Sequence, residues 1–162
     1  MFEEVIDAFS PMLSGFCLQL CRDKHEAEDL FQETWLNVLR YGERHGLDGI
    51  ENMKAWICKI SVNLYLDRVK HGKIENRIEF KDNEEKEYFF RNLEDRSQME
   101  YYAELYDAVS RLPAQLKTVV ILKYFDDFSD GEIAKITGMS VNSVRTHLSK
   151  AMSMLRRYMK DE

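Results

Sequence analysis

The sequence predicts an all-helical protein with two small domains joined by a flexible linker, the C-terminal one being a helix-turn-helix. Apolar side chains recur at steps of three and four residues in both halves of the chain, which is the period of a helix with one buried face. The 162 residues include only two prolines and seven glycines, too few turn-forming residues for the many short strands of a β-sandwich or barrel. A charged stretch with few aliphatic side chains separates the two halves and has little to bury.

The first domain is predicted over residues 1–71 and contains three helices. The first helix has its apolar stripe at Val5, Phe9, Met12, Leu13, Phe16 and Leu20. A second helix begins after the polar turn Arg22–Lys24, and a third runs from about Asn52 to Lys70. Between these two, the stretch Tyr41–Glu51 contains three glycines and is expected to be a loop.

Residues 72–100 are expected to form the linker, and residues 101–162 the second domain. In this domain Pro113 is expected to open a helix, because its missing N–H and fixed φ suit a first turn. Ser129 and Glu132 have the spacing of a capping box, in which each side chain satisfies an exposed amide of the other residue.

A short helix then ends at Gly138, which can adopt a left-handed turn, and Ser140 caps a longer helix that runs to about Lys160. Two helices joined by such a turn form the helix-turn-helix pattern. On the second helix the apolar stripe is Val144, Leu148, Ala151 and Leu155. We expect the polar residues between them to face outward.

The net charge of −6 argues against a protein that binds nucleic acid indiscriminately through an overall basic surface. The charge is uneven, however. The first domain carries −4, the linker −3 and the second domain +1, while the predicted helix 140–160 carries +5 and the helix 52–70 carries +3. Arginine and lysine neutralise phosphates, and Asn, Arg and Thr can contact base edges in a major groove. The last helix is therefore a candidate DNA-binding element.

Other function classes find little support. The three cysteines, Cys17, Cys21 and Cys58, have no zinc-site spacing and are expected to be buried free thiols in a reducing, cytoplasmic compartment. No secretory signal is expected at the N-terminus, which lacks early basic residues, and its longest uncharged run is too short to span a bilayer. Walker, HExxH and GxSxG motifs are absent from the sequence. We therefore expect no enzymatic activity, cofactor or metal.

Three ordered segments carry a family resemblance: EAEDLFQETWLNVLR, then KAWICKISVNLYLDRVK, then LPAQLKTVVILKYFDDFSDGEIAKITGMSVNSVRTHLSKAMSMLRR. Together they resemble the extracytoplasmic-function (ECF) sigma factors of bacterial RNA polymerase, which retain only sigma regions 2 and 4. The resemblance covers residues 5–71 and 101–160. It implies that region 2 binds core polymerase and the −10 promoter element, and that region 4 binds the −35 element. It also implies that the chain directs promoter recognition and DNA melting, while RNA synthesis belongs to the polymerase.

The resemblance also implies roles for individual residues. Those expected to bind core polymerase are Asp29, Gln32 and Glu33. Those expected at the −10 element are Asn63, Lys59, Arg44 and His45, the last two in a loop at about Glu43–Leu47 that captures a flipped base. Those expected at the −35 element are Lys123, Asn142, Arg145, Thr146, Ser149 and Lys150. Trp56 matches a tryptophan of the family, and its bulk favours a place in the core.

The partners that the resemblance implies are the β′ clamp helices and β flap of core RNA polymerase, promoter DNA, and an anti-sigma factor, which in this family is often anchored in the membrane. Two alternatives stay open from sequence. A helix-turn-helix transcriptional regulator would explain residues 101–160 but not EAEDLFQETW. A sigma-like adaptor that binds only proteins would keep the fold, but it should lack the basic residues Arg145 and Lys150.

Overall fold

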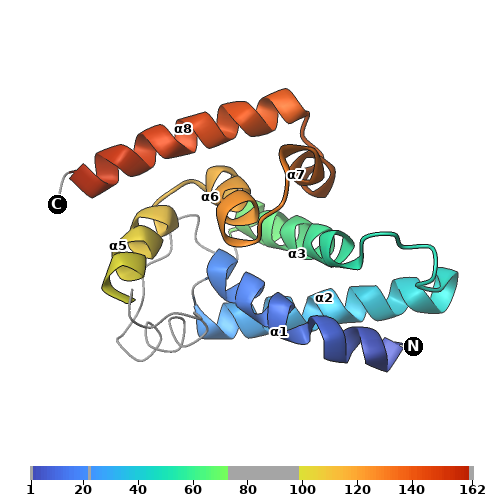
Figure 1. Cartoon of the computed structure of the whole chain (residues 1–162). Coiled ribbons are helices and arrows are strands. Elements are labelled where there is room, and N and C mark those ends of the chain that lie inside the picture. Colours follow the sequence, from blue (N-terminus) through green and yellow to red (C-terminus); the bar gives the residue numbers. More distant parts are fainter. Residues whose placement is uncertain (1, 22, 73–98, 161–162) are drawn as a thin grey trace.

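Every regular element among the described residues is a helix, which confirms the predicted fold class. The computed structural model describes residues 2–21, 23–72 and 99–160 (Figure 1). The elements are α1 (Phe2–Cys21), α2 (Lys24–His45), α3 (Met53–Lys70), α5 (Met99–Ser110), α6 (Ala114–Val120), the π-helical turn η2 (Ile121–Phe125), α7 (Asp130–Thr137) and α8 (Val141–Lys160). The linker predicted over 72–100 lies almost wholly outside the described residues, and α5 begins inside its expected end.

The first three helices pack together into one layer of the molecule. Figure 1 shows α1 and α2 lying along one another, with α3 against them. Their buried apolar side chains include Leu13, Phe16, Leu20, Leu30, Val38, Ile57 and Val62. The three cysteines are buried free thiols, as predicted, and burial raises the pKa of Cys21 to about 12. These thiols are packing groups of the core rather than reactive ones.

A buried polar contact ties α2 to α3 within this core. The hydroxyls of Thr34 and Ser61 lie 3.0 Å apart, and both side chains are fully buried. Thr34 donates its own hydroxyl to the carbonyl of Leu30 at 2.7 Å, so the proton between the two hydroxyls comes from Ser61. Because buried polar groups need partners, this pair fixes the register of α3 on α2.

The loop predicted over Tyr41–Glu51 is shorter than expected, because α2 continues to His45. Tertiary packing overrides the glycine signal here. The Tyr41 ring lies 4.9 Å from that of Trp56 on α3, and a side chain at Gly42 would come within 3.3 Å of Leu47. The helix ends only at Gly46, whose φ of 72° suits glycine. The prediction that a loop at Glu43–Leu47 holds Arg44 and His45 is therefore wrong, since both lie in the last helical turn.

The second half of the chain forms another helical cluster. In Figure 1 α8 runs across one side of the molecule, over α5, α6 and α7, all of which it contacts. The predicted stripe of α8 is buried in this cluster, with Val144 and Ala151 at 0% exposure. The remaining core residues include Leu112, Val119, Ile121, Leu122, Ile133 and Ile136. The helix that follows Pro113 changes to the π-helical turn η2 after Val120.

The local signals of the helix-turn-helix are confirmed. The Glu132 amide donates to the Ser129 hydroxyl at 3.1 Å, and the Ser129 amide donates to the Glu132 carboxylate at 3.0 Å. Gly138 ends α7 in the left-handed region with a φ of 77°. The Ser140 hydroxyl accepts the amide of Ser143 at 3.1 Å and so caps α8.

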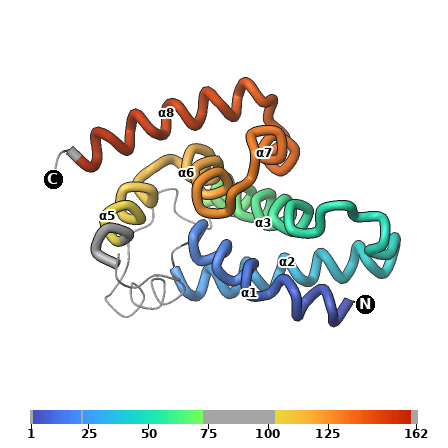
Figure 2. Tube along the Cα trace, viewed as in Figure 1, coloured from blue at the N-terminus to red at the C-terminus, as the bar shows by residue number. Residues whose placement is uncertain are grey.

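The two halves of the chain contact one another through α3. Figure 2 shows α6 and α7 resting on α3, on the side away from α2. α3 is thereby packed between two helical layers, which explains why its apolar residues do not fall on a single face. None of the described helices is long and apolar enough to cross a membrane.

The turn between α7 and α8 gives a first testable prediction. Gly138→Ala should lower the free energy of unfolding by about 1 kcal/mol, because a Cβ is strained at positive φ. Gly131→Ala is the control. Its Cβ would meet only Ser129 Oγ at 4.0 Å, and within a helix alanine is favoured over glycine. Urea denaturation should therefore shift in opposite directions for the two variants. Equal shifts would contradict the role given to Gly138.

Candidate nucleic-acid and protein interfaces

The acidic face of α2 is the first candidate interface. Asp23 caps this helix by accepting the amide of His25 at 2.9 Å. About two turns further on, the side chains of Asp29 and Gln32 are exposed on the outer surface. Glu33 differs, because its carboxylate pairs with the Arg68 guanidinium of α3. The structure thus leaves Asp29 and Gln32 accessible, while Glu33 also holds α2 against α3.

The residues expected at the −10 element lie on two neighbouring elements. Lys59 and Asn63 are exposed one turn apart on α3. Arg44 and His45 are exposed at the end of α2. Asn63 also lines an open groove of about 560 Å³ whose opposite wall is the start of α6, at Pro113, Ala114 and Gln115.

An aromatic cluster joins these two elements. The ring of Tyr41 lies 4.7 Å from that of His45 and 4.9 Å from that of Trp56. Trp56 was expected in the core, and it is half-buried and packs against the core. Tyr41 is 39% exposed. An exposed aromatic surface of this kind can stack on an unpaired base. Tyr41 is not among the residues that the sequence points to, because its neighbouring glycines predict a loop there.

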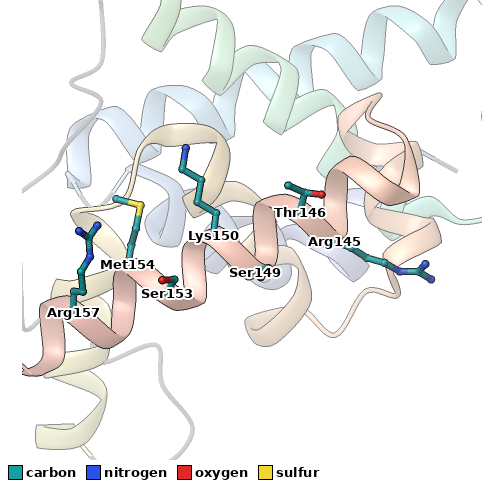
Figure 3. Close-up of a pocket in the computed structure, with 7 residues that line it drawn as sticks. All are labelled: Arg145, Thr146, Ser149, Lys150, Ser153, Met154 and Arg157. Carbon is teal, nitrogen blue, oxygen red and sulfur yellow. The ribbon is translucent and has the colours of Figure 1, made fainter.

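The outer face of α8 is the third candidate interface. All six residues expected to face outward on this helix are exposed: Asn142, Arg145, Thr146, Ser149, Lys150 and Ser153. An open groove of about 850 Å³ runs along this face (Figure 3) and is lined by Arg145, Thr146, Ser149, Lys150, Ser153, Met154 and Arg157. Its rim holds three cationic side chains and no carboxylate. Such a surface can accept a phosphate backbone and place polar side chains at base edges.

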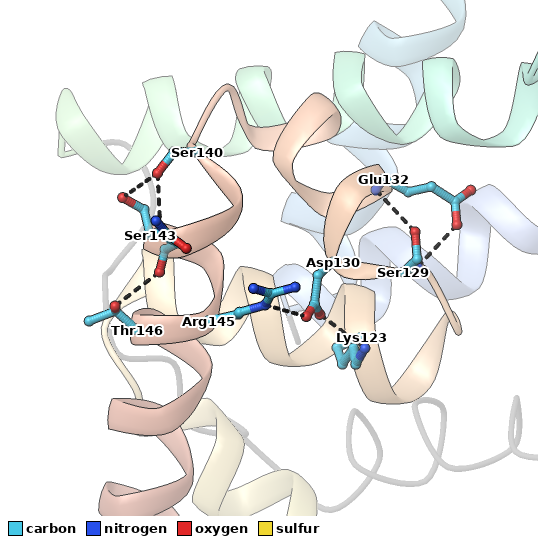
Figure 4. Close-up of polar contacts among 9 residues, drawn as sticks. Lys123, Ser129, Asp130, Glu132, Ser140, Ser143, Arg145 and Thr146 are labelled. Atoms are coloured by element: carbon cyan, nitrogen blue, oxygen red, sulfur yellow. Dashed lines mark hydrogen bonds and ion pairs between the residues drawn. The ribbon is translucent and has the colours of Figure 1, made fainter.

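Arg145 and Lys123 both contact Asp130, a residue to which the sequence assigns no role. Asp130 Oδ1 lies 2.9 Å from Lys123 Nζ, and Asp130 Oδ2 lies 3.3 Å from Arg145 Nε (Figure 4). The hydrogen bond from Lys123, followed by that from Arg145, lowers the pKa of the Asp130 carboxyl. The sequence shows that an acid stands at the first position of α7. It does not show that this acid lies within reach of Lys123 and Arg145, because that distance depends on how the helices pack.

The contact between the two halves is built from lysines and aromatic rings. Lys54 of α3 donates to the Asp126 carbonyl at 3.3 Å, and its ammonium lies 5.1 Å from the centroid of the Phe128 ring. In the opposite direction, the fully buried Lys117 of α6 lies 5.1 Å from the Tyr65 ring of α3. Cation–π contacts of this length are favourable when they are shielded from water.

A further hydrogen bond crosses the same boundary. The amide of Asn52, which caps α3, donates to the Glu132 carboxylate of α7 at 3.2 Å. Asp126 lies at the same boundary, and burial of its carboxyl raises its pKa to about 6. The positive charge of Lys54 only partly offsets this rise. Within the part of the chain that the structure describes, no three His, Cys, Asp or Glu side chains are grouped to hold a metal ion.

Comparison with known families identifies both halves. Residues 5–73 match the Sigma-70 region 2 family, and residues 102–155 match Sigma-70 region 4. RNA polymerase sigma factor SigV of Bacillus subtilis is 31% identical over 135 residues, which are 83% of this chain and 76% of SigV. ECF RNA polymerase sigma factor SigW of the same organism is 24% identical, with 99% of this chain and 89% of SigW covered.

The chain belongs to the ECF sigma factors. It contains sigma regions 2 and 4 and directs transcription initiation as a non-catalytic subunit of RNA polymerase. The alternative of a helix-turn-helix regulator without region 2 is thereby wrong.

Solved structures agree with this ECF sigma factor in fold. The sigma factor RpoE in complex with the anti-sigma factor NepR, from Bartonella quintana, superposes with a TM-score of 0.71 at 22% identity, covering 98% of this chain and 96% of RpoE. CnrH in complex with the cytosolic domain of CnrY gives 0.68 at 16% identity, with coverages of 99% and 88%.

The boundary between the two regions should depend on pH through Asp126. Its pKa is about 6 in the folded sigma factor against an ordinary 3.8, so the folded state binds more protons between these values. Its contribution to stability is therefore present at low pH and is lost as pH rises from about 4 to 6. Asp126→Asn should raise the free energy of unfolding at pH 7 by about 1–2 kcal/mol and flatten this part of the profile.

Asp127→Asn is the control for Asp126, because it removes the same charge from an exposed neighbour whose φ of 58° asparagine tolerates. The Asp127 charge raises the pKa of Asp126 less than burial does, so this variant should keep most of the pH dependence. Thermal unfolding followed between pH 4 and pH 7 makes the comparison. A pH profile of Asp126→Asn parallel to that of the unmodified protein would contradict the raised pKa.

Proposed function

We propose that this ECF sigma factor binds core RNA polymerase through α2 and promoter DNA through α3 and α8. The observation that supports this most directly is the groove along α8, where Arg145, Thr146, Ser149 and Lys150 line one exposed face. Their types and spacing suit a helix in the major groove of the −35 element. Asn142 is exposed on α8 itself, near its start, and Lys123 lies on η2.

Region 2 is proposed to bind the −10 element and to stabilise its opened strand. The exposed Lys59 and Asn63 of α3, together with Arg44 and His45 at the end of α2, supply charge and hydrogen-bonding groups. The Tyr41 ring beside them offers a stacking surface. Flipping a base costs a few kcal/mol, which stacking and pairing contacts in a pocket can offset. Promoter melting then needs no bond chemistry from the sigma factor.

We divide the chain into region 2 at residues 1–71, a linker at 72–100 and region 4 at 101–162. The partners proposed for region 2 are the β′ clamp helices, and the β flap is proposed for region 4. An anti-sigma factor is proposed as a regulator. It is supported by the fold shared with RpoE, whose structure was solved with the anti-sigma factor NepR. The proposed compartment is the cytoplasm, where the polymerase acts. An adaptor without DNA contacts is disfavoured by the basic groove of α8.

Core polymerase binding can be tested on the exposed face of α2. Asp29→Ala combined with Gln32→Ala should reduce co-purification with core polymerase at least tenfold, because both side chains face outward without holding the core. Glu4→Ala combined with Asp7→Ala, on the exposed side of α1, removes more negative charge and should leave binding unchanged. Undiminished binding by the α2 variant would contradict this interface.

DNA binding by α8 can be tested at Arg145. Arg145→Ala should weaken −35-dependent runoff transcription by the holoenzyme by about 1–3 kcal/mol, the usual effect of losing a base-contacting arginine. Arg156→Ala is the matched control, since it removes the same charge from the same face three turns later. The control should lower activity on promoters with and without a −35 element alike. Runoff that is indifferent to Arg145→Ala would contradict the role of this residue.

A further inference from the structure

One carboxylate joins three elements behind the proposed DNA-binding face. Asp130 is the first residue of α7, and its two oxygens contact Lys123 of η2 at 2.9 Å and Arg145 of α8 at 3.3 Å. Figure 4 shows the Arg145 side chain extending from α8 toward Asp130, with Lys123 on the other side of the carboxylate. Arg145 is thus held before any DNA arrives.

Asp130 is well fixed in space for such a contact. The reciprocal hydrogen bonds of Ser129 and Glu132 set the start of α7 immediately around it. Its side chain is 24% exposed, whereas that of Arg145 is 65% exposed. The carboxylate is therefore the anchored partner and the guanidinium the mobile one, so the contact restricts Arg145 more than it restricts Asp130.

The atoms involved leave Arg145 free to contact DNA. The carboxylate takes the Nε–H group, while an arginine has four further N–H groups on its two terminal nitrogens. Bidentate recognition of guanine O6 and N7 uses two such groups. A contact through Nε therefore orients the guanidinium plane and does not consume the donors that a base would need.

We propose that Asp130 is a positioning residue that determines specificity at the −35 element, by orienting Arg145 toward a guanine. This inference rests on the proposed function of α8. Lys123 then has the role of holding the carboxylate rather than contacting DNA itself, which refines its expected place at the −35 element.

Removing the Asp130 carboxylate should change the affinity for DNA and the discrimination between bases in opposite directions. A carboxylate near the DNA repels phosphates, so its removal should raise non-specific affinity. The same removal lets the Arg145 side chain adopt other rotamers, which should weaken the preference for one base. Loss of a residue with only a structural role would not raise the non-specific affinity for DNA while weakening the preference for one base.

The test is a binding selection with the full chain assembled on core polymerase. The probe is a pool of duplex DNA fragments with a fixed −10 element and randomised bases across the −35 element, sequenced before and after binding. We expect the unmodified protein to enrich a guanine at one position. Asp130→Asn should reduce that enrichment about tenfold at the same position as Arg145→Ala, while total retention of DNA stays equal or rises.

Three further variants keep the result interpretable. Asp127→Asn removes the same charge from an exposed residue nearby and should leave the enrichment profile unchanged. Asp130→Glu restores a carboxylate and should recover part of the guanine preference, which a failure of α7 to fold would not allow. Adding Asp130→Asn to Arg145→Ala should cause no further loss, because the first residue acts through the second.

The outcomes distinguish this proposal from the one it rests on. An Asp130→Asn profile identical to that of the unmodified protein, or sharper, overturns the positioning role while DNA binding by α8 stands. The same holds if Asp130→Asn relaxes a position different from the one that depends on Arg145. A profile of the unmodified protein without any preferred base at the −35 element overturns both proposals.

Discussion

The packing of α3 between two helical layers is the constraint on which the rest of the structure depends. One side of this helix meets α1 and α2, and the other meets α6 and α7. The first contact is closed by the Thr34–Ser61 hydroxyl pair and the Glu33–Arg68 ion pair. The second is closed by two lysines over aromatic rings. Between the two covered sides, the exposed residues of α3 are Lys59, Asn63, Asp67 and Lys70, and the −10 contacts are proposed on the part around Lys59 and Asn63.

The features that could be predicted from sequence are those decided by near neighbours in the chain. The capping box at Ser129 and Glu132, the left-handed Gly138 and the cap at Ser140 all depend on hydrogen bonds over three or four residues. The stripe of α8 was equally predictable, because its period determines which residues face the core. The exposed residues of α8, and with them the proposed −35 face, followed from the same period. Family resemblance supplied their roles, which periodicity alone does not give.

The features that could not be predicted arise from contacts between distant segments. α2 extends past Gly42 because Tyr41 packs against Trp56 of another helix, a gain that outweighs the low helix propensity of glycine. The contact of Asp130 with Lys123 and Arg145 joins three elements whose relative distances are set by the core. The burial of Lys117 is a third case, because a lysine in a helix is normally expected in water.

The contact between α3 and region 4 limits how far apart α3 and α8 can lie. A chain of 162 residues folded as one body has a radius of gyration of about 15 Å, so its width is about 40 Å. Positions −10 and −35 lie about 85 Å apart along B-form DNA, at 3.4 Å per base pair. One rigid body of this width cannot place α3 and α8 on the two elements together. If each helix binds its element as proposed, the Asn52–Glu132 and Lys54–Asp126 hydrogen bonds are given up on a promoter, and the form described here is the one that exists away from it.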